Sequence, residues 1–333
     1  MTQMLSRVAD SLYWMSRYLE RAEHTARALD VQLEIALDEA PWSASVGWVC
    51  LLDGVRADLP MEVCADGRAI AQSLALDRSQ PLSVACSIGN ARENARQIRE
   101  SITSEMWEEI NRIYLSLRTL DIDRLWSSGT DSTLRNVHRG GQMIAGIIDS
   151  TMRHGEGWEF IRLGRFLERA MSVAWFLEAH FGVRGVDLPD DSSSAEFVAW
   201  AGLLRSCCAF EPYCKVHTAE LLPPRILQFL LLDAEFSHSV RFAAEQISSS
   251  AKALAESTGS PRDSVLHRRA GRLAAELSYV TIEEVLASDL SEFMRSIVTQ
   301  CAQIHDALYR QYVGYTVEAV PSGKAVEMLR GAS

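Results

Sequence analysis

The chain has 333 residues, of which 47% are hydrophobic, and carries a formal net charge of -11. This acidic balance excludes broad electrostatic binding to nucleic acid or to an anionic membrane surface. The seven cysteines include no CxxC pair, so the sequence predicts neither a disulfide framework nor a metal site.

The apolar runs are too short to cross a membrane. The longest extends from Phe197 to Leu204, whereas a membrane-spanning helix needs about 20 apolar residues. Arg7 and Asp10 interrupt the N-terminal segment, where a signal peptide would be uniformly apolar. The sequence therefore predicts a cytoplasmic protein with no membrane partner.

Apolar residues recur with a helical period through most of the chain, which predicts an all-α fold. A long first helix should end before Pro41. Its apolar seam advances in steps of three and four residues and consists of Leu5, Val8, Leu12, Met15, Leu19, Ala22, Ala26, Leu29 and Leu33. Further helices are expected at about 81–104, 105–126, 134–153, 158–181, 194–208, 236–257, 262–287 and 289–312.

Three short patterns occur twice in the same order, which predicts an internal duplication. The hexapeptide 17–22 (RYLERA) returns as 165–170 (RFLERA), at an offset of 148 residues. Segment 48–52 matches 200–204, and the pairs 76–77 and 83–84 match 232–233 and 239–240. We therefore expect a helical bundle built from two duplicated, mutually packed halves. Their predicted bounds are 1–150 and 151–313, packed as one domain, with an irregular tail at 314–333.

The repeated Glu-Arg pair predicts a polar centre. Arg17 and Glu20 lie on one side of a helix, with His24 one turn further on. Because aromatic residues such as Tyr13 and Trp14 share that side, the charges should be buried and should need partners. The partners are expected in the other copy of the motif or in segment 92–96.

The candidate residues of this centre support two interpretations: a structural ion-pair network, or a site that binds a ligand or partner. The candidates are Arg17, Glu20, Arg21, His24, Arg92, Glu93, Asn94, Arg96, Arg165, Glu168 and Arg169. The sequence contains no GxGxxG, P-loop, HExxH or GxSxG motif, so we expect no cofactor. Whether the chain is an enzyme stays open at this point.

The two Glu-Arg motifs and their surroundings resemble the bacterial alpha-E family, a domain of unknown function. The resemblance is carried by segments 4–23, 91–96, 104–107, 157–160, 163–170 and 229–233. It implies an all-helical protein that is commonly encoded beside an ATP-grasp amidoligase-like protein and a transglutaminase-like cysteine protease. The signature pairs of the family fall on Glu20-Arg21 and Glu168-Arg169.

The resemblance implies an accessory or co-catalytic partner of an ATP-grasp-type peptide or amide ligase, with the transglutaminase-like protease as a second partner. Two alternatives remain open. The chain could be a stand-alone enzyme that acts on peptide or amino-acid carboxylates, with Glu20 or Glu168 as general base. It could also be a purely structural helical scaffold.

Overall fold

The structure is a computed structural model that describes residues 4, 6–38, 41–128, 132–185, 194–218, 220–261 and 264–314. Every regular element in these residues is a helix, which confirms the all-α prediction. The first helices are α1 (Ser6–Asp38), α2 (Pro41–Val55), α3 (Met61–Cys64), α4 (Gly67–Leu76), α5 (Val84–Gln97), η1 (Arg99–Ser101), α6 (Ser104–Leu117), α7 (Ile122–Ser128) and α8 (Ser132–Thr151). They are followed by α9 (Glu156–Arg184), α10 (Ser194–Ser206), α11 (Phe210–His217), α12 (Pro223–Leu232), α13 (Val240–Thr258), α14 (Val265–Tyr279), α15 (Ile282–Ala287), α16 (Leu290–Leu308) and η2 (Tyr309–Val313).

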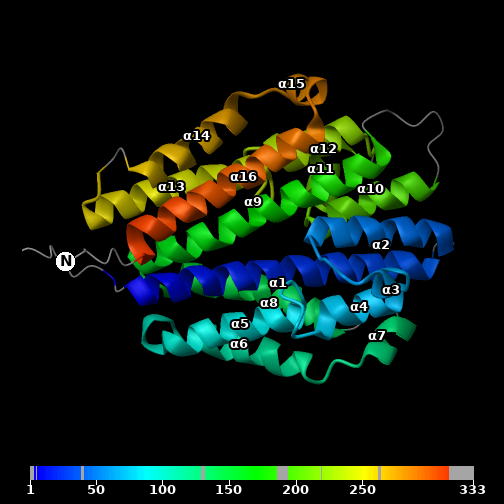
Figure 1. The fold of residues 1–333 in the computed structure, drawn as a ribbon, viewed down its shortest axis with the longest axis horizontal. Helices are drawn as coiled ribbons and strands as arrows, with labels where there is room; N and C mark the ends of the chain where they lie inside the picture. The colour runs from blue at the N-terminus through cyan, green and yellow to red at the C-terminus, as the bar shows by residue number, and fades with distance from the viewer. Residues whose placement is uncertain are drawn as a thin grey trace, which may run out of the picture.

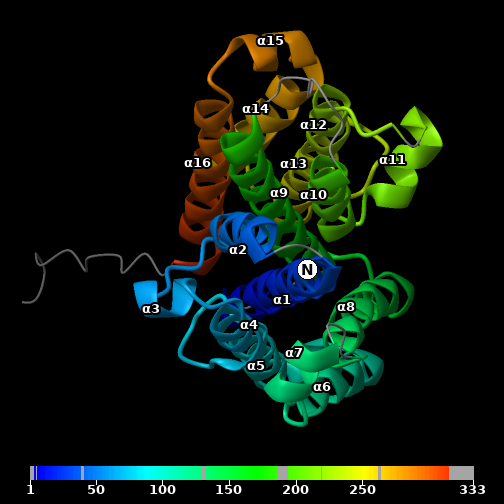
Figure 2. The same ribbon diagram turned by 90° about the vertical axis from the view of Figure 1, so that its right-hand side faces the viewer.

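Two long helices, α1 and α9, run side by side through the middle of the bundle (Figure 1). Helices α5 and α8 pack on α1, while α13 and α16 pack on α9. Helix α2 also packs on α9, and α10 packs on α1 (Figure 2). Helix α2, which follows α1 in the chain, therefore covers α9, and helix α10, which follows α9, covers α1. Together with the other packed helices they enclose α1 and α9 along most of their length.

The predicted seam of α1 forms the core. Leu12, Met15, Leu19, Ala22, Ala26, Leu29 and Leu33 are buried, and so are the residues 148 positions later, from Phe160 to Leu177. Leu5 lies outside the described residues. The two helices approach closely at Gly164, where an added Cβ would lie 2.2 Å from Ser16 Oγ and 2.4 Å from the Tyr13 carbonyl oxygen. Only glycine permits this approach.

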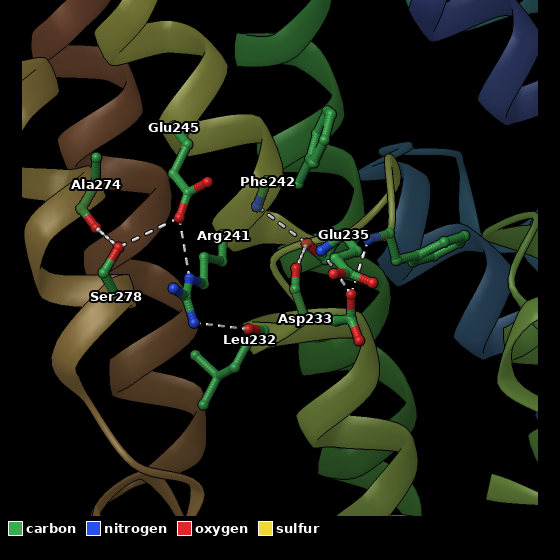
Figure 3. Close-up of polar contacts among 10 residues, drawn as sticks. Leu232, Asp233, Glu235, Arg241, Phe242, Glu245, Ala274 and Ser278 are labelled. Carbon is green, nitrogen blue, oxygen red and sulfur yellow. Dashed lines mark hydrogen bonds and ion pairs between the residues drawn. The ribbon is translucent and has the colours of Figure 1, made fainter. Parts of the chain in front are cut away.

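The turns that lead into α5 and α13 have the same hydrogen bonds. Before α13, the Asp233 carboxylate accepts bonds from the backbone of Glu235 and Phe236, and Ser239 Oγ donates to the Asp233 carbonyl (Figure 3). Before α5, Asp77 and Ser83 repeat this arrangement, and each serine caps its helix. The matched Leu-Asp and Ser-Val pairs thus encode a helix end followed by an N-cap.

The helix ends differ from the sequence prediction in three places. The helix predicted at 81–104 is shorter, because α5 ends at Gln97 and the short helix η1 follows before α6 begins at Ser104. The helix predicted at 105–126 is two helices, because the chain leaves α6 after Leu117 and restarts at Ile122. The helix predicted at 262–287 is broken by a capping box, in which Thr281 and Glu284 bond to each other's backbone and start α15. Helices α2, α3, α4, α11 and α12 were not predicted, since most are too short to show a clear period.

The division of the chain into halves at 1–150 and 151–313 remains a prediction. Arg56 and Cys208, at the offset of 152 residues seen in the sequence, both adopt a left-handed backbone with φ 57° just after α2 and α10. A superposition of residues 6–128 on 156–308 would test the duplication directly. The predicted tail at 314–333 lies outside the described residues, apart from Gly314. Among the described helices, none combines the length and apolar character that a bilayer span requires.

Candidate functional site

Glu168 on α9 binds two arginines of α1. Its Oε2 lies 2.7 Å from Arg17 Nε, and its Oε1 lies 2.6 Å from Arg21 Nε. The side chain of Glu168 is only 1% exposed. Both carboxylate oxygens are therefore occupied by guanidinium groups of the facing helix.

Glu20 on α1 shows the reciprocal arrangement with two arginines of α9. Arg169 forms a bidentate pair with it, with Nε to Oε1 at 2.5 Å and Nη2 to Oε2 at 3.0 Å. Arg165 Nε lies 3.4 Å from Glu20 Oε2. Arg169 also donates to the carbonyl of Ser237 in the turn before α13. Each Glu is thus satisfied by the arginines of the other motif and not by its own neighbour.

Burial and pairing of the two carboxylates confirm the expected polar centre. Glu20 and Glu168 are 6% and 1% exposed, and Arg169 is 3% exposed. Burial would by itself raise the pKa of Glu20, but Arg169 and Arg165 outweigh it and hold the pKa below the usual range. Arg17 and Arg21 have the same net effect on the pKa of Glu168. Both carboxylates are therefore ionised at neutral pH.

Aromatic residues of α1 complete the shell around these charges. Arg17 lies over the Trp14 ring at 5.1 Å and Arg21 over the Tyr18 ring at 5.5 Å, which explains the aromatic residues beside the motif. Arg17 also donates to the Tyr13 hydroxyl, which lies 2.8 Å from His305 Nδ1 on α16. Burial raises the pKa of Tyr13 to about 12, so this hydroxyl stays protonated.

His24 lies one turn beyond Glu20, as predicted, and is partly buried. Its ring meets Phe176 edge-to-face at 4.7 Å, and its Nε2 has no hydrogen-bond partner among the described residues. Burial lowers the pKa of His24 to about 4, although Glu20 partly opposes the shift. Burial likewise lowers the pKa of His180 to about 3. Both imidazoles are neutral in the folded protein at neutral pH.

These neutral histidines predict a stability that falls in mild acid. In the unfolded chain His24 takes up a proton near pH 6.5, whereas in the folded chain it does so only near pH 4. Folding stability should therefore decrease as the pH is lowered through this window, by about 3 kcal/mol for His24 alone. Urea unfolding between about pH 7.5 and about pH 4.5 measures the effect. His24→Gln should make the profile shallower, with the His180 contribution remaining, and an equally steep profile in this variant would contradict the assignment.

The segment predicted as an alternative partner lies elsewhere. Arg92 donates to Asn111 on α6 at 2.6 Å, and Asn94 donates to the Asn90 carbonyl. Glu93 and Arg96 pair with each other on the surface of α5. The structure therefore brings Arg17, Glu20, Arg21, His24, Arg165, Glu168 and Arg169 together, and it places segment 92–96 outside this centre.

Arg17, Glu20 and Arg21 begin a row of charged residues along α1, the charged stripe. This stripe continues beyond the residues that the sequence analysis identified. Glu23 is buried and pairs with Arg27 at 3.3 Å, and Asp30 follows at the same helical spacing. Burial, and then repulsion by Glu20, raise the pKa of Glu23. The repeat of acidic residues at 20, 23, 30 and 34 was the available signal for this extension. The described residues contain no group of three or more metal-ligating side chains.

Comparison with known proteins identifies a family. The Alpha-E family, described as a predicted alpha-helical domain with a conserved ER motif, has a sequence model that matches residues 4–313. The ER motif corresponds to the Glu-Arg pairs at 20–21 and 168–169. No solved structure matches the chain.

The relatives found among curated proteins are longer than this chain. An uncharacterized protein of Mycobacterium bovis and uncharacterized proteins of two Mycobacterium tuberculosis strains are each 24% identical to it over 331 residues. The match covers 91% of this chain but only 36% of each relative. In these proteins the matched region is accompanied by further sequence.

Proposed function

The chain belongs to the Alpha-E family, and we propose that it acts as an accessory or co-catalytic helical partner of an ATP-grasp-type peptide or amide ligase. The observation that carries this proposal is the saturation of the Glu/Arg centre. Glu20 and Glu168 each receive two guanidinium groups and have lowered pKa values. A carboxylate of this kind is a weak general base, because a catalytic base needs a pKa near the operating pH.

The lengths of the relatives support an accessory role. The matched region occupies about a third of each relative, so there it works as one part of a longer chain. The resemblance also connects the family with an ATP-grasp-type protein and a transglutaminase-like protease. We place the protein in the cytoplasm, where the ligase would have access to ATP.

The stand-alone enzyme and the purely structural scaffold are the competing functions. An enzyme that used Glu20 or Glu168 as its base would have to separate that carboxylate from two arginines in a buried site, which is energetically unfavourable. A scaffold would contain the same saturated centre but would not change the activity of any ligase. Activity measurements therefore separate these functions from the accessory one.

We expect the purified chain to form no amide product when it is incubated alone with ATP and amino acids. Addition of the chain to the ATP-grasp-type protein encoded beside it should increase ATP-dependent amide formation above that of the ligase alone. Product formation is followed by mass spectrometry and ATP consumption by phosphate release. Turnover by the chain alone would overturn the proposal in favour of an enzyme, and an unchanged ligase rate would favour the scaffold.

A further inference from the structure

A second polar feature lies at the end of the charged stripe on α1. A cavity of about 430 Å³ opens between α1, α8, α10 and the start of α11. Its charged lining comes from Arg27 and Asp30 on α1, Arg135 and His138 on α8, Arg205 on α10 and Glu211 on α11. Its volume falls in the range of small-molecule sites, which are commonly found between helices of a bundle.

Asp30 is the buried acceptor of this cavity. The residue is 7% exposed, and its Oδ1 accepts no hydrogen bond from the described residues. Its Oδ2 lies 3.7 Å from His138 Nε2 and 3.9 Å from Arg135 Nε, both beyond hydrogen-bond length. A buried carboxylate without close donors is unfavourable unless a further donor reaches it.

Two hydrogen-bond donors that lack an acceptor lie beside the Asp30 carboxylate. Arg135 Nε and His138 Nδ1 are buried and have no hydrogen-bond partner among the described residues. The other two arginines are engaged, since Arg27 pairs with Glu23 and Arg205 pairs with Glu34. The cavity therefore presents an anionic acceptor and a cationic donor side by side, each with unused hydrogen-bonding capacity.

We propose that this cavity binds a free α-amino acid, with its ammonium group on Asp30 and its carboxylate on Arg135. In an α-amino acid a single carbon joins the ammonium and carboxylate groups, which matches the close spacing of Asp30 and Arg135. Val31, Phe210 and Pro212 add an apolar wall for a side chain such as that of leucine. This inference goes beyond the proposed function, because it assigns a small-molecule site outside the Glu/Arg centre.

Other ligand classes fit the cavity less well. Inorganic phosphate bound in the cavity would lie next to the Asp30 carboxylate, and the two negative charges would repel each other. A divalent metal needs several oxygen or nitrogen ligands, and no such group occurs in the described part of the chain. A simple amine or a simple carboxylate would engage one of the two charged groups and leave the other unmatched.

L-Leucine and two analogues, each lacking one of its two charged groups, test the proposal in the wild-type protein. Titration calorimetry with L-leucine should give saturable binding at millimolar concentration. Isocaproate lacks the ammonium group and isoamylamine lacks the carboxylate, so each should bind at least about tenfold more weakly than leucine. No saturable binding of leucine, or equal binding of all three probes, would overturn the proposal and leave ordered water as the partner of Asp30.

Two variants assign the charged groups. Asp30→Asn should abolish the preference for leucine over isocaproate, and Arg135→Gln should abolish the preference for leucine over isoamylamine. Arg112→Gln, which removes an exposed arginine that pairs with the half-buried Glu109 on α6, is the matched control and should bind like the wild type. Circular dichroism checks that each variant is folded. A folded Asp30→Asn variant with unchanged preference would refute the proposed orientation.

The binding experiment requires no ligase. Failure to bind leucine would therefore leave the accessory role intact. Conversely, a lack of ligase stimulation would leave the amino-acid site intact.

Discussion

Glu168→Ala is expected to lower the free energy of unfolding by about 3 to 5 kcal/mol, the largest effect that we predict for a single substitution. The reason is that Arg17 and Arg21 both bind this carboxylate, and Arg17 is only 7% exposed at its side chain. Without Glu168, the positive charge of Arg17 would be buried next to that of Arg21 with no counter-charge. Urea unfolding monitored by circular dichroism at neutral pH measures the change.

Two control variants make this result interpretable. Glu168→Gln should be less destabilising than Glu168→Ala, because the amide oxygen still accepts a hydrogen bond from one arginine. Glu93→Ala removes an exposed partner of Arg96 on α5 and should leave unfolding unchanged. If Glu168→Ala unfolded at the same urea concentration as Glu93→Ala, the pairs would not stabilise the fold, and a ligand-binding role would become the better explanation.

Gly164→Ala is expected to destabilise the protein by about 2 to 3 kcal/mol, although alanine is the better helix former. The added methyl group would lie 2.4 Å from the Tyr13 carbonyl oxygen, which belongs to the backbone and cannot rotate away. Helices α1 and α9 would have to separate, and the four ion pairs that join them would lengthen. Urea unfolding gives the free energy of unfolding.

The matched control is a glycine-to-alanine replacement at a helical position where the added methyl group has open space around it. Gly271 lies in the interior of α14, and an added Cβ there would meet no atom within 4 Å. Gly271→Ala should therefore raise the free energy of unfolding by about 0.5 to 1 kcal/mol. Equal effects of the two substitutions would show that the close approach at Gly164 is not required.

The long helices could be predicted from the sequence because their apolar residues recur with a clear period. The seam from Leu12 to Leu33 gave α1, and its counterpart gave α9. Short helices such as α3 and α11 could not be predicted in this way, since one or two turns hold too few apolar residues. The break before α15 had a local signal in Thr281 and Glu284, which form a capping box.

The sequence identified the two Glu-Arg motifs as the candidate site but left their partners open between the other copy of the motif and segment 92–96. The repetition of the hexapeptide indicated a polar centre, and the aromatic residues beside the charges indicated that the charges are buried. Which arginine binds Glu20 depends on how α1 and α9 cross, and a single sequence does not contain that information. The cavity near Asp30 was missed for the same reason, because Arg135 and Arg205 are far from Asp30 in the chain and only the packing of α8 and α10 brings them near.

The reciprocal pairing also determines the register of the two central helices. A helix pair with continuous apolar seams could slide by one turn, about 5.4 Å, and still bury most of its leucine and alanine residues. Such a slide would break the bonds of Glu20 and Glu168 to the opposite arginines together. The Glu/Arg centre thus disfavours every alternative alignment of α1 with α9, and neither helix can satisfy its charges until both halves of the chain have met.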